Sequence, residues 1–522
     1  MKSEIHAPFI TRRRFLQRIG PAALGVSALA ATVRDLRLMN TALAQAGGIN
    51  DYKAMICIFM NGGNDANNLI IPTIPSEYNN YATVRTPAVA LPNMDGTTAT
   101  AIQLKNAAGT GSYQDAAGHN YAFHPALKEL ADLFNSGKCA PILNVGTLSY
   151  PLTKAQYTAK SVPFPPQLFS HSDQQTQWQT SIPDVPPTTG WFGRMDDLFT
   201  QPVDVNVGGG ISMAVTVAGS NVLEVGSVNA APQYAITTGG AVTISNMNTA
   251  RTTALNSILG VDMGTSPAGV VTDLQTKAYA NVLNHAISEA ASLSAALTTQ
   301  QNSNPSWFTR FNPVVVTPNG GSTNSNSSLM SQMKMVARLI DLGSSVLNMK
   351  RQVFFIQVGG YDTHTGQTGN AGSSTTNNAS VVIGQQANLF AELSQTINAL
   401  MLAMHDIGVA RSTSTPFENN VTAFTVSDFA RTFPSNGSGS DHGWGGHHLV
   451  VGGAVKGGAT YGKFPTLAVN GPDDTGIGRW IPTTSVDQYA ATLASWFGVQ
   501  ASNIPLLFPN IGRFASSNLG FI

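Results

Sequence analysis

The residues with the clearest capacity for chemistry lie in one short stretch near the C-terminal end of the chain. Asp441 is followed directly by His442, and His447 and His448 come a few residues later. Carboxylate oxygens and imidazole nitrogens are the donors that divalent metals bind in proteins. The glycines between these residues allow the backbone to turn tightly. The spacing predicts a set of metal ligands, and the alternative is a polar surface loop whose Asp and His residues stabilise turns.

The segment before this stretch predicts how its residues are positioned. Residues 421–426 form an apolar, β-branched run that is typical of a buried strand. Asp428 and Arg431 follow directly. In open α/β sheets ligands bind beyond the carboxyl ends of the strands, which is where this polar stretch would lie. Arg431 is a candidate to hold an anion with paired N–H donors.

A second polar loop follows another predicted strand, the apolar run 54–60. We expect Asp65 to be a metal ligand and Asn64 and Asn67 to orient an anionic substrate. The alternative is that the Asn-Gly and Gly-Gly pairs of this loop are ordinary turn formers.

Further candidates come from the middle of the chain. The apolar run 352–358 predicts a strand, and Asp362 and His364 come just after it, as metal ligands or as an Asx turn with an incidental histidine. Ser170 stands beside His171, a pair that could provide a nucleophile beside a base or metal ligand. Such pairs are also common by chance. Arg194 is a second candidate to bind an anion.

Apolar periodicity places these loops in a mostly parallel α/β sheet. Helices are expected at 123–133, 271–297, 329–347, 385–405 and from a capping box at Ser485, and a further strand at 138–145. Residues 202–270 are nearly free of charge and alternate short β-branched runs with Gly, Ser and Asn, which predicts a β-rich insertion or cap. We therefore expect one domain over 47–522.

The N-terminal segment 1–46 is predicted to be a twin-arginine export signal. Thr11-Arg-Arg-Arg-Phe-Leu-Gln17 precedes an apolar run, and Ala44-Gln-Ala46 resembles a cleavage site. The alternative is a basic amphipathic helix. The twin-arginine translocase is then a partner during export, and the mature chain is periplasmic or secreted, without a transmembrane segment. A net charge of zero gives no indication of nucleic-acid binding. Cys57 and Cys139 are expected to be buried free thiols, with a disulfide as the alternative.

Taken together, the loop motifs resemble the DUF1501 family of twin-arginine-exported proteins, within the alkaline phosphatase–sulfatase–phosphoglycerate mutase superfamily. The motifs that carry the resemblance span nearly the whole mature chain: Asn61-Gly-Gly-Asn-Asp65, His124-Pro-Ala-Leu, Ser170-His171 with Trp178, Gly190-Trp-Phe-Gly-Arg194, Asp362-Thr-His364, Asp428-Phe-Ala-Arg-Thr432, Asp441-His442-Gly443 and Arg479-Trp-Ile-Pro482.

This resemblance implies an α/β/α sandwich of alkaline-phosphatase-like type with one or two divalent ions, zinc, manganese or calcium. Ser170 would stand at the place of the nucleophile. The chain departs from the superfamily in the close Asp-x-His spacing of its middle pair and in the late position of Asp65. The ligands implied for one metal are Asp65, Asp441 and His442; those implied for a second are Asp362, His364 and His447 or His448.

The function implied is that of an exported metal-dependent hydrolase of phosphate or sulfate esters. In such a reaction cations neutralise the non-bridging oxygens of the ester and lower the pKa of a water or of the serine. Two alternatives stay open: a non-catalytic exported binding or structural protein on a degenerate phosphatase-like fold, and transfer of a phosphoryl-type group to glycans.

Overall fold

A computed structural model describes most of the chain after the predicted export signal. The described residues are 49–92, 101–186, 188–200, 204–208, 210–226, 233–242, 248–258, 274–312, 315–316, 323–324, 326–370 and 378–522. The predicted signal at 1–46 lies outside them.

The centre of the molecule is a 10-stranded sheet, with strand order β14-β5-β13-β12-β1-β11-β6-β7-β8 and β15 paired to β5. Most neighbouring strands are parallel, whereas β13 runs antiparallel to β12 and β5, and β8 runs antiparallel to β7. Its strands are β1 (Lys53–Met60), β5 (Cys139–Gly146), β6 (Ala214–Thr216), β7 (Tyr234–Thr237), β8 (Gly240–Ala241), β11 (Arg351–Val358), β12 (Val421–Ser427), β13 (Gly446–Gly452), β14 (Tyr461–Gly462) and β15 (Thr484–Ser485).

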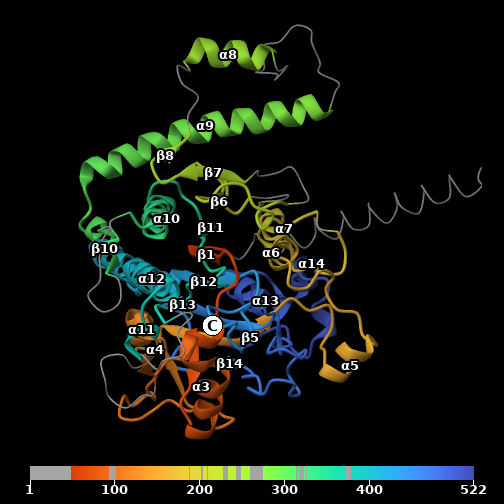
Figure 1. The fold of residues 1–522 in the computed structure, drawn as a ribbon. Helices are drawn as coiled ribbons and strands as arrows, with labels where there is room; N and C mark the ends of the chain where they lie inside the picture. Colours follow the sequence, from red (N-terminus) through yellow and green to blue (C-terminus); the bar gives the residue numbers. More distant parts are fainter. Residues whose placement is uncertain are drawn as a thin grey trace, which may run out of the picture.

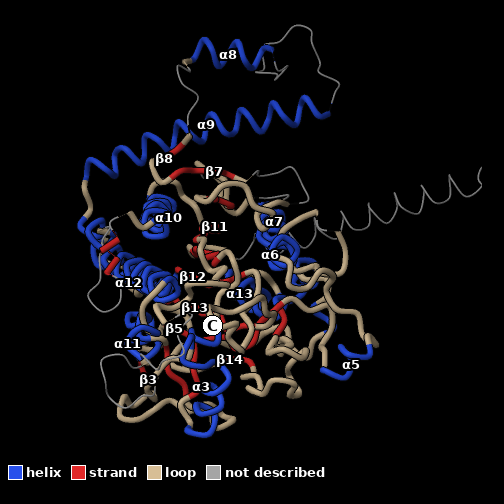
Figure 2. The backbone as a smooth tube through the Cα atoms, in the orientation of Figure 1, coloured by secondary structure: helices blue, strands red, loops and turns tan. Residues whose placement is uncertain are grey.

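Helices cover both faces of this sheet, because its central strands are apolar on both sides (Figure 1, Figure 2). Along β1, Ile56 and Ile58 join one core and Met55 and Phe59 join the other, as the strand period of two requires. The first core contains α4 (Lys128–Asn135), α10 (Ser328–Ser345) and α12 (Gln385–Ala410). The second contains α6 (His171–Thr180), α7 (Trp191–Thr200), α13 (Val486–Phe497) and α14 (Ile504–Leu507).

Shorter elements surround these layers. A 3-stranded sheet has the order β2-β4-β3, and a 2-stranded sheet pairs β10 with β9. The remaining strands are β2 (Ile70–Pro72), β3 (Ile102–Gln103), β4 (Tyr121–Phe123), β9 (Val315–Val316) and β10 (Thr323–Asn324). The remaining helices are α2 (Ala66–Leu69), α3 (Pro75–Val89), α5 (Lys154–Ala159), α8 (Thr249–Ile258), α9 (Leu274–Ser303), α11 (Asn378–Val381), η1 (Pro125–Leu127), η2 (Ser306–Phe311), η4 (Phe417–Asn420), η5 (Ala501–Asn503) and η6 (Ile511–Arg513).

The α/β class and the mostly parallel sheet predicted from the sequence are confirmed. The predicted helix at 123–133 is wrong at its start: Phe123 ends β4, His124 caps a 3-10 turn at Pro125, and α4 begins at Lys128. Proline is favoured in the first turn of a helix, so the chain before Pro125 is not helical. The apolar spacing alone did not show this and placed the start of the helix too early. The capping box at Ser485 is confirmed, with its side chain accepting from the backbone of Gln488.

Within residues 202–270 the described elements are strands β6 to β8 and helix α8, and β6 extends the main sheet beside β11. The division of the chain into one domain with an insertion stays a prediction. Cys57 and Cys139 are both buried free thiols, as expected. Among the described helices, none combines the length and apolar character that crossing a membrane requires.

Candidate metal centre

The three central parallel strands β1, β11 and β12 end side by side and place three loops at one edge of the sheet. Arg431 ties these loops together: its Nη1 donates to the carbonyl of Gly62 at 3.1 Å and to Oδ1 of Asp362 at 2.7 Å, and its Nη2 donates to the carbonyl of Ser440. Gly62 has a φ of 115°, and a Cβ there would overlap the backbone of Asp362. Only glycine allows this close approach.

Three histidines from three segments meet at this edge, and each is held by a hydrogen bond from Nδ1. His171, the first residue of α6, lies with Nδ1 2.6 Å from Oδ2 of Asp428. His364 has its Nδ1 2.8 Å from Oδ1 of Asp441. Nδ1 of His442 lies 2.8 Å from the backbone carbonyl oxygen of Phe169. Because all three partners are acceptors, each Nδ1 carries a hydrogen and each neutral ring keeps a lone pair on Nε2.

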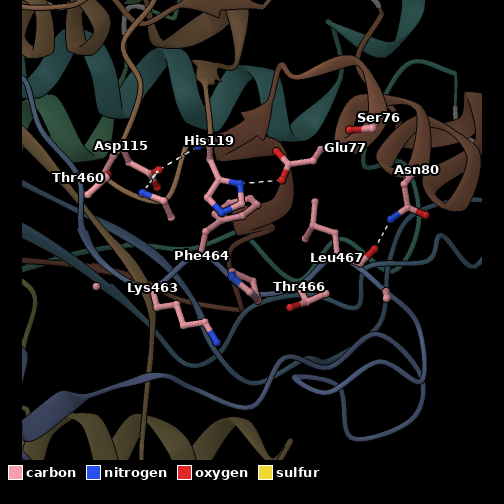
Figure 3. Close-up of a pocket in the computed structure, with 15 residues that line it drawn as sticks. Ser76, Glu77, Asn80, Asp115, His119, Thr460, Lys463, Phe464, Thr466 and Leu467 are labelled. Carbon is pink, nitrogen blue, oxygen red and sulfur yellow. Dashed lines mark hydrogen bonds and ion pairs between the residues drawn. The ribbon is translucent and has the colours of Figure 1, made fainter.

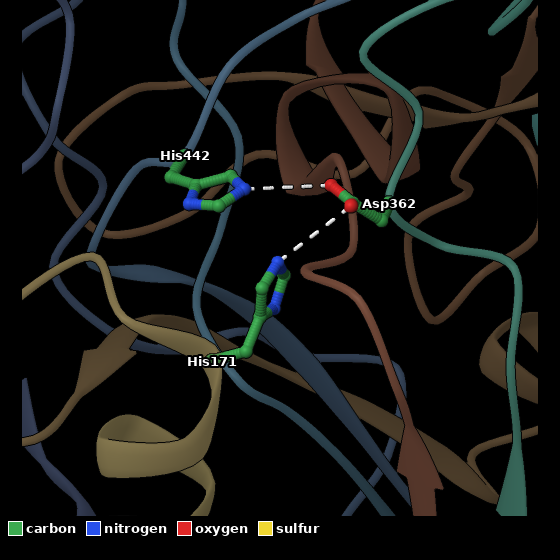
Figure 4. A group of neighbouring side chains, drawn as sticks. All are labelled: His171, Asp362 and His442. Atoms are coloured by element: carbon green, nitrogen blue, oxygen red, sulfur yellow. Dashed lines mark ion pairs between the residues drawn. The ribbon is translucent and has the colours of Figure 1, made fainter.

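These three Nε2 atoms point toward the carboxylate of Asp362. The distances from Nε2 to a carboxylate oxygen are 3.7 Å for His171, 3.2 Å for His364 and 3.4 Å for His442. Ligand atoms of His171, Asp362 and His442 all lie within 4.8 Å of one another (Figure 4). The Nε2 atoms of His364 and His442 are 2.9 Å apart. Two lone pairs at that distance repel unless a proton or a cation lies between them.

This donor set fits a divalent metal. Tetrahedral zinc with Zn–N bonds of about 2.0–2.1 Å spaces its ligand atoms about 3.3–3.4 Å apart. The distances of 3.2–3.7 Å from Asp362 to the three Nε2 atoms are close to this spacing, whereas Nε2 of His364 and Nε2 of His442 lie closer together, at 2.9 Å. Histidine ligands in metal sites commonly donate their second N–H to a carboxylate or a backbone carbonyl. That is the arrangement found at all three rings, with Asp428, Asp441 and the carbonyl of Phe169. Asp362 supplies the negative charge.

The electrostatics of the centre favour metal ligation. Burial would raise the pKa of Asp362, but the hydrogen bond and charge of Arg431 and the neighbouring imidazoles more than offset this effect, so that pKa is lowered. The same balance lowers the pKa of Asp441, where hydrogen bonds from Asn436 and His364 outweigh burial. Burial lowers the pKa of His442, and nearby cationic groups add to the effect. The carboxylates are therefore ionised and His442 is neutral near pH 7.

Aromatic rings and one arginine border the centre. The ring of Phe429 packs against His171 and His442, with centroid distances of 4.8 and 4.6 Å. Arg479 lies over the ring of Phe169 at 4.0 Å, and its Nε donates to the carbonyl of His442 at 2.7 Å. Its two terminal nitrogens have no hydrogen-bond partner within the described part of the chain. This partly exposed guanidinium remains free to bind an anion.

The structure places Asp65 outside this group of ligands. Asp65 caps α2 by accepting from the backbone of Asn67, and its fully buried carboxylate pairs with Arg85 and Gln367. Four residues separate the end of β1 at Met60 from Asp65, which is buried at the start of α2. The amide of Asn67 donates to Asp65 and to the carbonyl of Arg431. The amide of Asn64 is buried without a partner in the described structure.

His447 and His448 lie in β13, and both are packed inside the fold. Nδ1 of His447 accepts from the backbone of Asn144, and its ring stacks on Phe464. The ring of His448 packs against Trp178. Burial lowers the pKa of both imidazoles to about 3. Neither imidazole lies with the three rings that converge on Asp362. The structure therefore does not bring together the two separate sets of metal ligands that the resemblance implied.

Two further candidates make their contacts elsewhere. Arg194 donates to the carbonyls of Thr180, Thr189 and Leu507, and burial lowers its pKa to about 10. These contacts occupy its donors at the ends of two helices. The hydroxyl of Ser170 donates to Asp173 within the first turn of α6, as short polar side chains at helix starts commonly do.

Three residues of this centre, Asp428, Phe429 and Arg479, have roles that the sequence did not predict, whereas His171 was already a candidate base or metal ligand. His171 contributes Nε2 beside Asp362, and Asp428, Phe429 and Arg479 orient or border the ligands. The position of Asp428 just after a strand was a usable signal. Phe429 and Arg479 stand in two of the motifs that carry the resemblance, but nothing local in the sequence indicates what they contact, because their neighbours in space are distant in the chain.

A family model matches the part of the chain that holds most of these ligands. The family, described as "Protein of unknown function (DUF1501)", is matched over residues 322–476, which include Asp362, His364, Asp441 and His442. No curated protein matches the chain. A solved structure that the chain resembles is described as "Crystal structure of Ps i-CgsB in complex with k-i-k-neocarrahexaose"; the identity is 11%, the TM-score is 0.32, and 88% of this chain and 77% of that chain are covered. A TM-score this low is not evidence of a shared site.

Proposed function

We propose that this chain is an exported metal-dependent hydrolase of phosphate or sulfate esters. The observation that carries the proposal is the convergence of three imidazole Nε2 atoms on Asp362, with every Nδ1 held by an acceptor. Such an arrangement serves little purpose for packing alone, because these side chains are partly exposed and their lone pairs face one another.

The residues that would hold the ion are His171, His364, His442 and Asp362. Three nitrogen donors and one carboxylate favour zinc over calcium, which prefers an all-oxygen shell. A divalent cation here would supply positive charge to the non-bridging oxygens of an ester and would lower the pKa of a nearby water.

The chain's own residues prepare the site for an anionic substrate. Arg431 is buried and keeps Asp362 ionised and oriented, so its guanidinium is not free for substrate. Arg479 provides the free donors and would bind the sulfate or phosphate group beside His442. Asp428 holds the ring of His171 in place.

The nucleophile we infer is water. Ser170, the N-cap residue of α6, donates its hydroxyl hydrogen to Asp173 in the first turn of that helix. A water activated at the centre requires no rearrangement of α6.

Elemental analysis and an ester-hydrolysis assay test this proposal. Protein purified without chelators should carry zinc, and His442→Ala and Asp362→Asn should each remove it. His405→Ala is the matched control, because His405 is an exposed histidine on α12 outside the centre. The wild type should hydrolyse an aryl phosphate or an aryl sulfate, and the activity should disappear with the metal. Failure to bind zinc, manganese or calcium would refute the proposal.

A non-catalytic metal-binding protein is the second candidate function. It is favoured by the engagement of Ser170 and Arg431 in contacts within the protein, so that of these two and Arg479 only Arg479 keeps donors without a partner in the described residues. Metal bound at the centre without turnover of either ester would support this alternative.

A further inference from the structure

Two cavities of the molecule do not account for anion binding at the metal centre. A cavity of about 650 Å³ beyond the edge strand β14 shares no lining residue with the centre (Figure 3). A second cavity, of about 620 Å³, includes Asn61 and Gly359, but none of its described lining residues is charged. An oxyanion would therefore be held by side chains that contact the proposed metal ligands, as Arg479 does.

Phe169 contacts both His442 and Arg479. Its backbone carbonyl oxygen lies 2.8 Å from Nδ1 of His442. The guanidinium of Arg479 lies over its ring at 4.0 Å, and Nε of Arg479 donates to the carbonyl of His442 at 2.7 Å. Each of the three residues thus contacts the other two. The position of the guanidinium relative to the proposed metal ligand depends on this set of three contacts.

The ring of Phe169 fixes the plane of the guanidinium. A guanidinium that is stacked on an aromatic face and bonded at Nε has lost most of its freedom to rotate. The two terminal nitrogens of Arg479 have no hydrogen-bond partner within the described part of the chain, so they can donate side by side to two oxygens of a phosphate or sulfate group. Because these donors are ordered before the anion arrives, less conformational entropy is lost on binding.

The backbone of Phe169 is held in a conformation that residues with a side chain rarely adopt. Its φ is 72°, in the left-handed region, where glycine meets no steric penalty. The chain turns here into α6, with Ser170 as the N-cap and His171 as the first residue. Phe169 packs against a buried cluster of Leu148, Trp444 and Ile481. Strained residues persist where surrounding contacts hold them, and they concentrate at functional sites.

We propose that Phe169 is a positioning residue of the anion site. Its ring holds the guanidinium of Arg479 in the orientation that receives an oxyanion, and its carbonyl, directed by the left-handed backbone, holds the ring of His442. Phe169 acts through these two neighbours and so joins the anion site to the metal centre. This inference rests on the proposed function, because it takes the centre to bind a metal ion and an oxyanion.

Two binding measurements on the zinc-loaded protein test the part played by the ring. Calorimetric titration with inorganic phosphate measures the anion site, and competition with a chromogenic chelator measures the zinc affinity. In Phe169→Ala and Phe169→Leu we expect phosphate to bind about tenfold more weakly with zinc affinity unchanged, because the stacking is lost and the carbonyl stays in place. Phe169→Tyr keeps an aromatic face and should bind phosphate as the wild type does. A general structural role would lower both affinities together.

Phe169→Gly, compared with Phe169→Ala, tests the part played by the strained backbone. Both variants lack the ring, but glycine adopts a φ of 72° without strain, so the glycine variant should unfold at a higher denaturant concentration. It should also bind zinc more weakly, because the carbonyl that meets His442 is no longer held in one direction. Lys160, the exposed C-cap of α5 with a φ of 52°, is the control. Lys160→Gly should also be more stable than Lys160→Ala, with no difference in zinc or phosphate affinity.

Three outcomes would overturn this inference: equal phosphate affinity in the wild type and Phe169→Ala, loss of that affinity in Phe169→Tyr, or an alanine variant as stable as the glycine variant. Thermal unfolding shows whether each variant is folded, and Phe169→Leu, which keeps most of the apolar volume, replaces Phe169→Ala if the latter does not fold. If the wild type binds zinc and phosphate while the variants at Phe169 bind them equally well, only this inference fails. If the wild type binds neither, the proposed function fails and this inference fails with it.

Discussion

Nδ1 of His171 lies 2.6 Å from Oδ2 of Asp428, a carboxylate whose side chain is fully buried. The same oxygen accepts from the backbone of Gly62 at 3.2 Å and from the amide of Gln175 at 3.0 Å. Asp428 therefore joins the loops after β1 and β12 to helix α6 and sets the direction of Nε2 of His171. Asp428 thus lies where, in known metal sites, an outer acceptor orients a histidine ligand.

Asp428→Asn tests this relationship. The amide keeps the shape of the side chain but loses the charge that holds the N–H of His171, so we expect the zinc affinity to fall about 10- to 100-fold. A competition titration with a chromogenic chelator measures the change. Asp173→Asn, at a carboxylate in the same helix, is the control and should bind zinc as the wild type does. An unchanged affinity in Asp428→Asn would show that His171 is not held through this contact.

Arg479→Gln tests the anion site. The substitution removes the charged donors beside His442, so we expect KM for the ester and the inhibition constant of inorganic phosphate to rise about tenfold or more, with zinc content unchanged. Arg310→Gln is a matched control, since Arg310 pairs with Asp406 on the surface. If only kcat falls, Arg479 does not bind the anion in the ground state.

Gly62→Ala tests the close approach of the loops after β1 and β11. Strain from a positive φ is expected to cost about 1–3 kcal/mol, and overlap of the new Cβ with Asp362 adds to this cost and displaces the ligand. Gly109→Ala is the control, because Gly109 also has a positive φ but has open space around the position of a Cβ. Denaturant unfolding and zinc affinity measure the two effects, and equal losses in both variants would exclude a role for the overlap.

Glu224 makes the stability of the protein depend on pH. Burial raises the pKa of this carboxyl from 4.5 to about 7. Because the folded state holds the proton more tightly, the stabilisation is complete below pH 4.5 and is lost as the pH rises through about 7. The loss amounts to about 3 kcal/mol. Glu224→Gln should remove this part of the pH dependence, as measured by denaturant unfolding between about pH 4 and pH 8.

The same substitution at Glu129, a partly exposed residue of α4 that accepts from the hydroxyl of Ser394, controls for the loss of one carboxyl group, because a glutamine can keep that hydrogen bond. A difference between wild type and Glu224→Gln that does not change with pH would contradict the raised pKa.

Export through the twin-arginine route predicts a specific dependence on Arg12 and Arg13. Replacement of both by lysine keeps the positive charge but should block export, because the translocase recognises the arginine pair. Cell fractionation, followed by detection of the mature chain in the cytoplasmic and exported fractions, measures the effect. Lys2→Arg leaves the pair intact and should be exported normally.

The strands and their polar loops could be predicted because apolar runs and the residues after them are local features. Asp362 and His442 were accessible in this way, since each follows a strand or a glycine-rich turn. The role of Asp65 could not be predicted in this way, because its pairing with Arg85 depends on where α3 packs. His447 and His448 show the same limit: strand alternation and the position of β13 decide that both are enclosed. No local pattern contains that information.

The position of β1 also has a consequence for how the protein folds. Its neighbours β11 and β12 begin at Arg351 and Val421, so the first strand waits for segments that are synthesised much later. Closing such long loops is slow, since their entropy must be lost before the strands pair. His171, His364 and His442 thus meet late in folding, and loading of the proposed zinc ion is expected to follow chain completion and not to accompany synthesis.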